Sequence, residues 1–298
     1  MSAKKRKKKN SKALPPLVAL ILAAILLVYY YFGEDFLDGF LADKTEWNTD
    51  GSFVMQAIDV GQGDSILLGC DGEYMLIDCG EEEYADTVIS AVGDAQLKYI
   101  LASHPHTDHM GGMAQVIRKC TPETFLMPER EHTTSEFKAM LSAIEDTGCD
   151  AQYVYAGDKL TLGSAEITVI WPEEGFESSN LNNWSAVLLV EYQTVRILLT
   201  GDSEKAVEAK YLDYIPGRVD ILKMSHHGSN TSSSEDLLYF IRPEYTVISV
   251  GAGNDYGHPH KEPMERLQEY CPNIYRTDES GNVTFTIKEG EISVATER

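Results

Sequence analysis

Three histidines and an aspartate fall close together in the run SHPHTDHMGG, and all four are side chains that bind transition metals. They are His104, His106, Asp108 and His109. Imidazole nitrogens and carboxylate oxygens are usual ligands of Zn²⁺, Mn²⁺ and Fe²⁺. The first two histidines flank a proline, so an extended segment can point both the same way, while Asp108 and His109 in the following turn face an adjacent position. We therefore expect ligands for two metal ions here, rather than a solvated histidine-rich loop.

Two further apolar runs end in residues of the same kind. Asp202 closes TVRILLTGD, and His226 and His227 close VDILKMSHH. Buried strands that end in ligand-type side chains can gather a site at one edge of a sheet. Taken alone, Asp202 is equally explained as the cap of a following helix. Together with the histidine cluster, these strand ends predict one shared metal site.

The rest of the pattern predicts the elements that must position these residues. Short apolar runs bounded by turn residues predict strands, and Asp71-Gly72 predicts a hairpin turn. We expect strands within residues 53–60, 66–70, 73–80, 97–104, 124–128, 151–157, 159–163, 165–172, 185–192, 194–202, 219–228 and 245–251, and a terminal hairpin over 282–295. We expect helices over residues 84–93, 110–119, 134–147, 203–212, 233–240 and 262–270. Such a mixture indicates an α/β protein with sheets covered by helices.

The N-terminal segment predicts a membrane anchor. Residues 14–32, LPPLVALILAAILLVYYYF, carry no charge, and a helix of that length spans about 28 Å, close to the apolar thickness of a bilayer. Basic residues precede it and acidic residues follow, which places residues 1–13 in the cytoplasm and the remainder outside. We expect a single-pass signal-anchor of the cell membrane, a linker over 33–50 and a folded extracytoplasmic domain over 51–298. A cleaved signal peptide, giving a secreted protein, is the alternative, but no A-x-A-like site closes the run.

Composition restricts the possible partners. The 298 residues are 43% hydrophobic and 24% charged, which excludes a mostly disordered chain. The formal net charge is −22, and seven basic residues precede residue 33, so the remainder carries about −29. Such a body repels polyanions, and we expect no strong general nucleic-acid binding, although a local cationic site could bind phosphate.

The cysteines argue against a structural zinc site. The five cysteines show no C-x-x-C spacing. If one pair bridges in an oxidising compartment, the expected pair is Cys120 with Cys149. The alternative is that most of them are small buried apolar residues.

At these residues the chain resembles the metallo-β-lactamase fold hydrolases, whose H-x-H-x-D-H signature matches SHPHTDHMGG. It is most similar to one branch, the extracytoplasmic hydrolase domain of ComEC-type competence (DNA uptake) proteins and their stand-alone relatives. The similarity extends in order over residues 53–285 through AIDVGQGDSILL, YMLIDCG, LLTGD, LKMSHHGSNTSSS, VISVGAGNDYGHP and RTDESG. It implies a four-layer αβ/βα sandwich with a binuclear metal site at its top edge. The transmembrane helix expected from the apolar run would precede this α/β domain.

The resemblance also implies a role for each candidate ligand. His104 and His106 would bind the first metal, Asp108, His109 and His226 the second, and Asp202 would bridge the two. His227 is expected to contact substrate, although spacing alone does not decide which of the adjacent histidines is the ligand. Asp64 and Asp78 would support the ligands from behind.

In one respect the chain departs from the wider fold. No histidine lies between His132 and His226, so the third histidine that many relatives bring to the first metal is missing. Asn183 and Ser185 stand near its place in the sequence. The first metal would then be more open, and the expected cofactors are two divalent ions, Zn²⁺ or Mn²⁺.

Such a site would activate water for hydrolysis. A hydroxide held between two metals attacks at neutral pH, and the metals stabilise charge on the attacked phosphate or acyl oxygen. The expected catalytic residues are Asp108, in the ligand shell, and His227 and His258, which could protonate or position the leaving oxygen. A surface histidine near a turn is the alternative for His258. Backbone N–H groups of residues 229–234 could cradle a phosphate, or simply begin a helix.

The function expected from these features is that of a membrane-anchored binuclear hydrolase, a phosphodiesterase or nuclease of ComEC type. The substrate would be a small phosphodiester or single-stranded DNA, and the negative body suits small diesters at least as well. One alternative is an acyl hydrolase acting on a thioester or lactone, which lacks specific support. Another is a non-catalytic domain tethered at the cell surface.

Overall fold

The folded body includes Trp47, the first residue that the structure describes. The computed structural model describes Trp47 and residues 49–298; the expected tail 1–13, transmembrane helix 14–32 and most of linker 33–50 lie outside the described residues. The Trp47 ring packs against Tyr74 at 6.4 Å between centroids, and the Gly72 N–H donates to Thr49 Oγ1 at 2.8 Å. Both residues therefore belong to the body. None of the helices in the described ranges has the length and apolar character needed to cross a bilayer.

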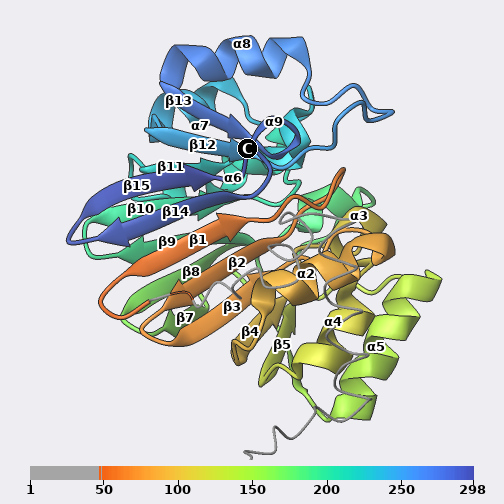
Figure 1. Cartoon of the computed structure of the whole chain (residues 1–298). Coiled ribbons are helices and arrows are strands. Elements are labelled where there is room, and N and C mark those ends of the chain that lie inside the picture. The colour runs from red at the N-terminus through yellow and green to blue at the C-terminus, as the bar shows by residue number, and fades with distance from the viewer. Residues whose placement is uncertain (1–46, 48) are drawn as a thin grey trace, which may run out of the picture. The chain divides into compact units, whose positions relative to one another are not determined.

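The first sheet has eight strands, in the order β15-β14-β1-β2-β3-β4-β5-β6 (Figure 1). These are β1 (Phe53–Ala57), β2 (Ile66–Cys70), β3 (Glu73–Ile77), β4 (Leu97–Leu101), β5 (Thr124–Met127), β6 (Asp150–Tyr153), β14 (Val283–Lys288) and β15 (Glu291–Thr296). The Asp71-Gly72 turn joins β2 to β3 with positive φ at both residues, as a tight hairpin requires. From β3 to β6 the strands run parallel.

The second sheet has seven strands, in the order β13-β12-β11-β10-β9-β8-β7. These are β7 (Lys159–Leu162), β8 (Ala165–Trp171), β9 (Val187–Tyr192), β10 (Val195–Leu199), β11 (Ile221–Lys223), β12 (Tyr245–Ile248) and β13 (Asn273–Arg276). Strands β10 to β13 are parallel, so their carboxyl ends meet at one edge. The sequence pattern did not predict β13.

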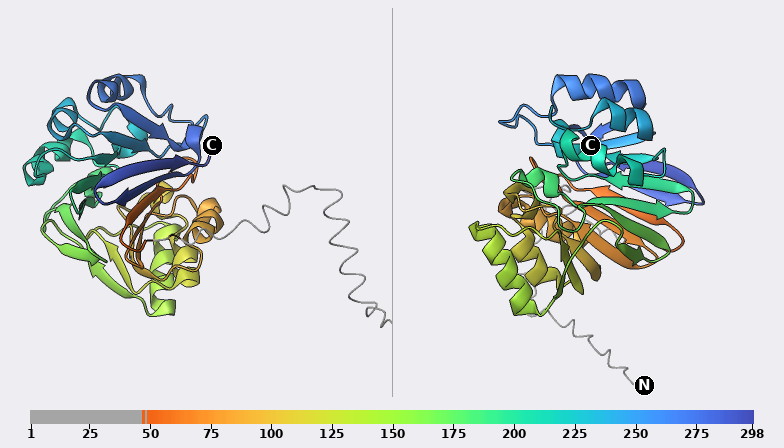
Figure 2. Two further views of the ribbon diagram at one scale, coloured as in Figure 1. Left: turned by 60° about the vertical axis from the view of Figure 1, so that its left-hand side comes forward. Right: turned by 180° about the vertical axis from the view of Figure 1, so that it is seen from behind.

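The two sheets face each other across an apolar core, and helices cover their outer faces (Figures 1 and 2). The helices are α2 (Ala85–Val92), α4 (Met113–Cys120) and α5 (Ser135–Thr147) on the first sheet, and α6 (Lys205–Tyr211), α7 (Glu235–Ile241) and α8 (Lys261–Tyr270) on the second. In α4, Met113, Val116 and Ile117 are buried on one face, the spacing of an amphipathic helix. The result is the mixed α/β sandwich that the sequence predicts.

All five cysteines are free thiols, so the expected bridge between Cys120 and Cys149 does not form. Both pack at the border of the apolar cluster beneath α4 and α5, and the Cys149 thiol donates to the Asp150 carbonyl at 3.4 Å. Cys70, Cys79 and Cys271 are buried. The cysteines therefore behave as small apolar residues.

Candidate metal centre

The carboxyl ends of strands from both sheets bring the candidate ligands to one edge of the sandwich. Asp78 follows β3 and His104 follows β4, while in the second sheet Asp202 follows β10 and His226 and His227 follow β11. Parallel strands place their carboxyl ends at the same edge, where α/β proteins gather their sites. Residues that are far apart in sequence therefore share one site, as predicted.

The turn after His109 needs its glycines. His106 precedes the short helix α3 (Thr107–Met110), and Gly111 follows it. A Cβ at Gly111 would lie 2.6 Å from the Thr107 carbonyl oxygen and 2.8 Å from the Glu82 nitrogen. Only glycine lets the chain pass this closely, so the tight turn directly after Asp108 and His109 depends on Gly111.

One oxygen, Oδ2 of Asp202, lies at the centre of the site. Imidazole Nε2 atoms approach it from four histidines: His109 at 3.3 Å, His226 at 3.7 Å, His227 at 3.7 Å and His104 at 3.9 Å. Asp202 itself is 1% exposed. A carboxylate in this central place can contact two cations at once, which is the bridging position expected for it.

Of the three groups of candidate donor atoms among the described residues, two share Asp202, and the third, Asp64, Asp78 and His109, does not. The first contains Asp108, His109, Asp202 and His227, and the second His104, His106 and Asp202; in each group the donor atoms lie within 4.8 Å of one another. In the second group His104 Nε2 and His106 Nδ1 are 3.0 Å apart. The two groups contain every predicted metal ligand except His226, and they also contain His227. His226 still reaches the site, with its Nε2 3.7 Å from Asp202 Oδ2.

Several donor atoms are buried without a hydrogen-bond partner. They are His109 Nε2, His227 Nε2 and Asp202 Oδ1. Buried polar atoms are nearly always satisfied, because an unpaired one costs free energy. Three unsatisfied atoms on side chains that converge on one another are what a divalent cation would satisfy. The residues present therefore fit a binuclear metal site.

Hydrogen bonds behind the ligands orient their rings. His109 Nδ1 lies 2.8 Å from Asp78 Oδ2, and His227 Nδ1 donates to the Ser249 carbonyl at 2.8 Å. Each contact uses the Nδ1 proton and leaves the Nε2 lone pair directed at the cluster, the usual arrangement behind metal-bound histidines. Asp78 is in turn held by the Ser103 hydroxyl at 2.6 Å. Asp78 therefore supports a ligand, as expected.

Ser185 lies behind His104 and does not replace the missing third histidine. Its hydroxyl is 3.3 Å from His104 Nδ1, the nitrogen that faces away from Asp202, and it accepts the Asp202 N–H at 2.9 Å. Asn183 Oδ1 instead accepts from the Glu204 N–H at 3.3 Å. Only three donors therefore make up the second group.

His226 and His227 are adjacent but have different surroundings. Both have positive φ, 50° and 52°, so the backbone turns sharply between their side chains. His227 is 1% exposed, whereas the His226 side chain is 20% exposed and its Nδ1 lies 3.1 Å from Thr231 Oγ1. The geometry thus favours His227 over His226 as the buried donor.

The carboxylates and the imidazoles of the site shift each other's pKa strongly and in opposite directions. Burial alone would raise the pKa of Asp202, but His109 and His227 outweigh it and hold that pKa well below its usual value. Burial would lower the pKa of His109, but Asp202, Asp78 and Asp108 raise it well above the usual value. The carboxylates thus favour a positive charge at the centre of the cluster, whether a proton or a metal ion supplies it.

Of the two alternatives for residues 229–234, the structure supports the start of a helix rather than a phosphate cradle, because their backbone N–H groups are already used. Those of Ser233 and Ser234 donate to the Glu208 carboxylate at 2.5 and 2.8 Å. The Asn230 N–H donates to His260 Nδ1 at 3.1 Å, and the N–H groups of Ser229, Thr231 and Ser232 bond within residues 226–232. Glu208 is 1% exposed, and the segment is a structural turn before α7.

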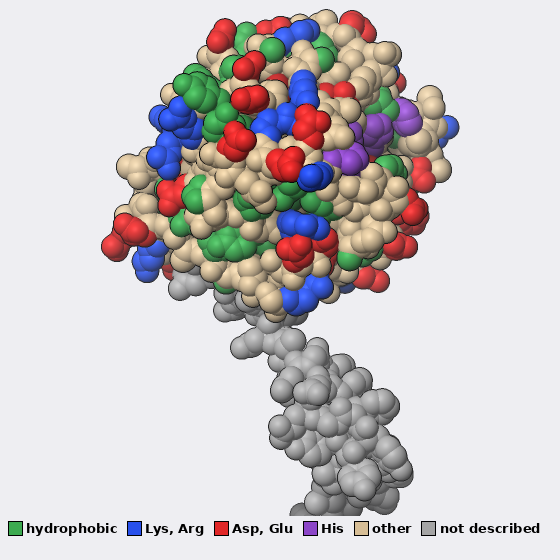
Figure 3. All heavy atoms as spheres, turned by 90° about the horizontal axis from the view of Figure 1, so that it is seen from above, with side chains coloured by type: hydrophobic (Ala, Val, Ile, Leu, Met, Phe, Trp, Pro, Cys, Tyr) green, Lys and Arg blue, Asp and Glu red, His purple; other side chains and the backbone are tan. Residues whose placement is uncertain are grey.

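His258 lies beside the site but in neither donor group. Its ring centroid is 5.6 Å from that of His226 and 6.1 Å from that of His227. Burial, and then the charges of His227 and His226, lower the pKa of His258 to about 4. The ring is therefore neutral near pH 7 and can hold an oxygen by a hydrogen bond rather than act as a strong acid. Histidine side chains gather at one place on the surface in Figure 3.

Two important charged residues were missed in the sequence. Lys223 is fully buried in β11, and its Nζ lies 2.8 Å from Asp64 Oδ2. Asp64 Oδ1 lies 3.5 Å from His227 Nδ1. A lysine within the apolar run ILKM was the available signal. Glu204, which accepts from Asn182 and Thr231 at 3.1 Å each, had no comparable signal.

Comparison with known sequences shows which proteins the chain is similar to. Residues 58–252 match the Metallo-beta-lactamase superfamily. ComE operon protein 3 of Bacillus subtilis is 28% identical and covers 78% of this chain and 32% of that protein. Recombination protein 2 of Haemophilus influenzae is 28% identical, with coverages of 84% and 30%. Competence protein ComA of Neisseria gonorrhoeae is 27% identical, with coverages of 86% and 35%. The resemblance to ComEC-type competence proteins is confirmed, and the chain spans about a third of the length of these relatives.

Solved structures share the fold at low sequence identity. The diiron β-hydroxylase CmlA of Streptomyces venezuelae gives a TM-score of 0.55 at 15% identity, covering 78% of this chain and 53% of that one. Igni18, a metallo hydrolase of Ignicoccus hospitalis, gives 0.51 at 10% identity, covering 82% and 100%. At such identities the likeness concerns the fold alone.

Proposed function

Because this chain belongs to the metallo-β-lactamase superfamily, we propose that it is a binuclear metal-dependent hydrolase whose substrates are phosphodiesters. One observation carries the proposal: four histidines and two aspartates form two donor groups around the central Asp202. The set contains no thiolate, and such imidazole and carboxylate donors suit Zn²⁺, Mn²⁺ and Fe²⁺.

The residues divide the work as follows. Asp202 would contact both ions, Asp108, His109 and His227 would complete the site of one, and His104 and His106 would hold the other. Two divalent ions bound there supply Lewis acidity and an activated water at neutral pH. Asp108 is partly open to solvent, with 28% of its side chain exposed, so substrate would enter beside it. His258 holds the leaving oxygen by a hydrogen bond.

The phosphodiester substrate is proposed from the relatives. Three of them are competence or recombination proteins by name, and nucleic acid is a phosphodiester. Since this chain spans only part of each, their whole activity does not transfer. An acyl substrate finds no such support.

The proposal also places the hydrolase outside the cytoplasm, held at the cell membrane through residues 14–32. The apolar run and the basic residues before it support this placement. We therefore expect the activity described below to sediment with membranes after an alkaline wash. Activity in the soluble fraction would indicate that the segment is cleaved.

The test is hydrolysis of bis(p-nitrophenyl) phosphate by the full chain reconstituted separately with Zn²⁺, Mn²⁺ or Fe²⁺. We expect metal-dependent turnover that Asp202→Ala reduces by at least about a thousandfold, because the variant loses the donor shared by both groups. Asp213→Ala, an exposed aspartate after α6, is the matched control and should keep full activity.

Absence of turnover with all three metals would overturn the proposal. Hydrolysis of a thioester or lactone instead, still lost in Asp202→Ala, would identify an acyl hydrolase. A chain that binds no metal would be a non-catalytic domain.

A further inference from the structure

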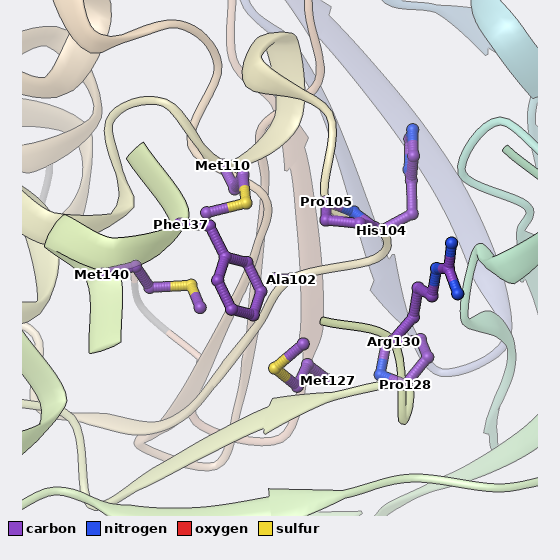
Figure 4. Close-up of a pocket in the computed structure, with 9 residues that line it drawn as sticks. All are labelled: Ala102, His104, Pro105, Met110, Met127, Pro128, Arg130, Phe137 and Met140. Carbon is purple, nitrogen blue, oxygen red and sulfur yellow. The ribbon is translucent and has the colours of Figure 1, made fainter. Parts of the chain in front are cut away.

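Arg130 is a cation that lines the same crevice as the candidate ligand His104, and none of the described acidic residues pairs with it. It follows β5 at the edge of the first sheet that carries the metal ligands, and it lines the same narrow crevice as His104 (Figure 4). Among the described residues no carboxylate forms an ion pair with its guanidinium, and its Nε is buried without a hydrogen-bond partner. The neighbouring Glu129 is occupied elsewhere, since it accepts from the Tyr155 hydroxyl at 2.8 Å.

The position of Arg130 is fixed by an aromatic platform. Its Cζ lies 5.5 Å from the ring centroid of Trp184, within the range of a cation–π contact. The Trp184 indole donates to the Ser178 carbonyl at 3.0 Å and packs edge-on against Phe176. Ser185, the next residue, contacts His104 and Asp202. The guanidinium is therefore positioned by the same chain segment, Trp184 and Ser185, that contacts the candidate metal ligands.

The crevice is lined by apolar side chains in its inner part and by two basic side chains at its other side. Met110, Met127, Phe137 and Met140 line its inner part, whereas His104 and Arg130 extend together away from that cluster in Figure 4. A planar guanidinium whose N–H groups lack an acceptor binds anionic oxygens strongly and in a fixed orientation.

We propose that Arg130 binds a non-bridging oxygen of an anionic phosphodiester and positions the phosphorus at the metal centre. This inference rests on the proposed function and specifies its substrate class: it requires a negatively charged substrate and not a neutral ester. It also explains how a body of net charge about −29 can accept an anion, since the positive charge is confined to the site.

The test compares Arg130→Met, Arg130→Lys and Arg118→Met in the metal-loaded full chain. Arg118 pairs with Asp146 at 3.0 Å on the surface of α4, so its variant is the matched control. The readouts are the dissociation constant of inorganic phosphate by calorimetry, and kcat/KM for bis(p-nitrophenyl) phosphate and for the neutral triester paraoxon. Metal content and Tm are measured in parallel.

We expect Arg130→Met to weaken phosphate binding, and to lower kcat/KM for the diester, by about 10- to 100-fold, the effect of one hydrogen bond to a charged group. Arg130→Lys should recover part of both, and Arg118→Met should match the wild type. Any triester turnover should change by less than about threefold.

Phosphate binding by Arg130→Met within about twofold of the wild type, with two metals bound, would overturn the inference. So would equal losses for diester and triester, which would show that Arg130 merely supports Trp184. The binding measurement needs no turnover, so it reports on Arg130 even if the phosphodiesterase proposal fails.

Discussion

His226 and His227 show how far a single backbone turn can separate two identical side chains. His227 Nε2 lies 3.3 Å from Asp108 Oδ2 and 3.7 Å from the buried Asp202 Oδ2, with its Nδ1 held by a backbone carbonyl. His226 Nδ1 faces Thr231 and the Glu204 carboxylate at the edge of solvent. A metal ligand needs an oriented and desolvated lone pair. The Nε2 atoms of both rings lie 3.7 Å from Asp202 Oδ2, but only the His227 ring is fully buried.

We therefore expect His227→Ala to retain about one metal ion per chain and to lose at least about a hundredfold in kcat. His226→Ala should keep two ions and lose less than about tenfold, since neither donor group includes it. Metal stoichiometry by mass spectrometry and steady-state kinetics on the diester check both variants. Loss of an ion from His226→Ala alone would restore the assignment expected from the family motif.

At the scale of elements, a buried ion pair ties β11 to the loop between β1 and β2. Lys223 and Asp64 are 1% and 3% exposed at their side chains, and Lys223 also donates to the Met224 carbonyl at 2.9 Å. Asp64 Oδ1 also lies 3.5 Å from His227 Nδ1, although that nitrogen donates to the Ser249 carbonyl. The pair thus holds a loop of the first sheet against the strand that carries a ligand.

Breaking this pair should destabilise the body even without metal. Lys223→Met keeps the length of the side chain but leaves Asp64 buried and unpaired, and we expect it to lower the free energy of unfolding by about 3–5 kcal/mol. Lys223→Met combined with Asp64→Asn should recover part of that loss.

Urea unfolding in excess chelator measures both variants. Lys98→Met, which breaks a more exposed pair with Glu73, is the control, with an expected cost below about 1 kcal/mol. A cost for Lys223→Met no larger than that of Lys98→Met would show that the pair contributes no net stability.

The elements themselves could largely be predicted, because turn residues and apolar runs mark their ends. The Asp71-Gly72 hairpin and the helices over 134–147 and 262–270 are examples. The strand β13 could not, since its four residues are only half-buried and show no alternation. Likewise, the sequence predicts that ligands lie at strand ends, but it does not predict where their side chains point. At His226 and His227 the positive φ angles decide that direction.

Contacts between distant residues explain the other failures. Residues 229–234 have the composition of an anion-binding turn, but Glu208, more than 20 residues earlier, already accepts two of their N–H groups. Arg130 lacks any local motif. Only its contact with Trp184 and the crevice that it lines together with His104 distinguish it. Neither fact is visible in a window of sequence.

At the scale of the whole molecule, the site exists only where the two sheets meet. His104, His106, Asp108 and His109 come from the first sheet, and Asp202 and His227 from the second. Backbone bonds fasten the two sides beside the ligands: the Ala186 N–H donates to the Ser103 carbonyl at 2.9 Å. Metal bound there would contact both sheets and so stabilise their packing.

The charge of the body leads to a prediction about long substrates. Beyond residue 33 the chain carries about −29, so it repels single-stranded DNA more than a dinucleotide with one diester charge. Added salt screens repulsion over a Debye length of about 10 Å at 0.1 M. We therefore expect kcat/KM for a single-stranded oligonucleotide to rise several-fold between about 20 and 200 mM NaCl, while that for the dinucleotide stays nearly constant.

A steep fall of kcat/KM with salt would instead show that a cationic track binds several phosphates, because binding that releases counterions weakens as salt is added. In that case the extended strand, rather than a small diester, would be the better substrate despite the net charge.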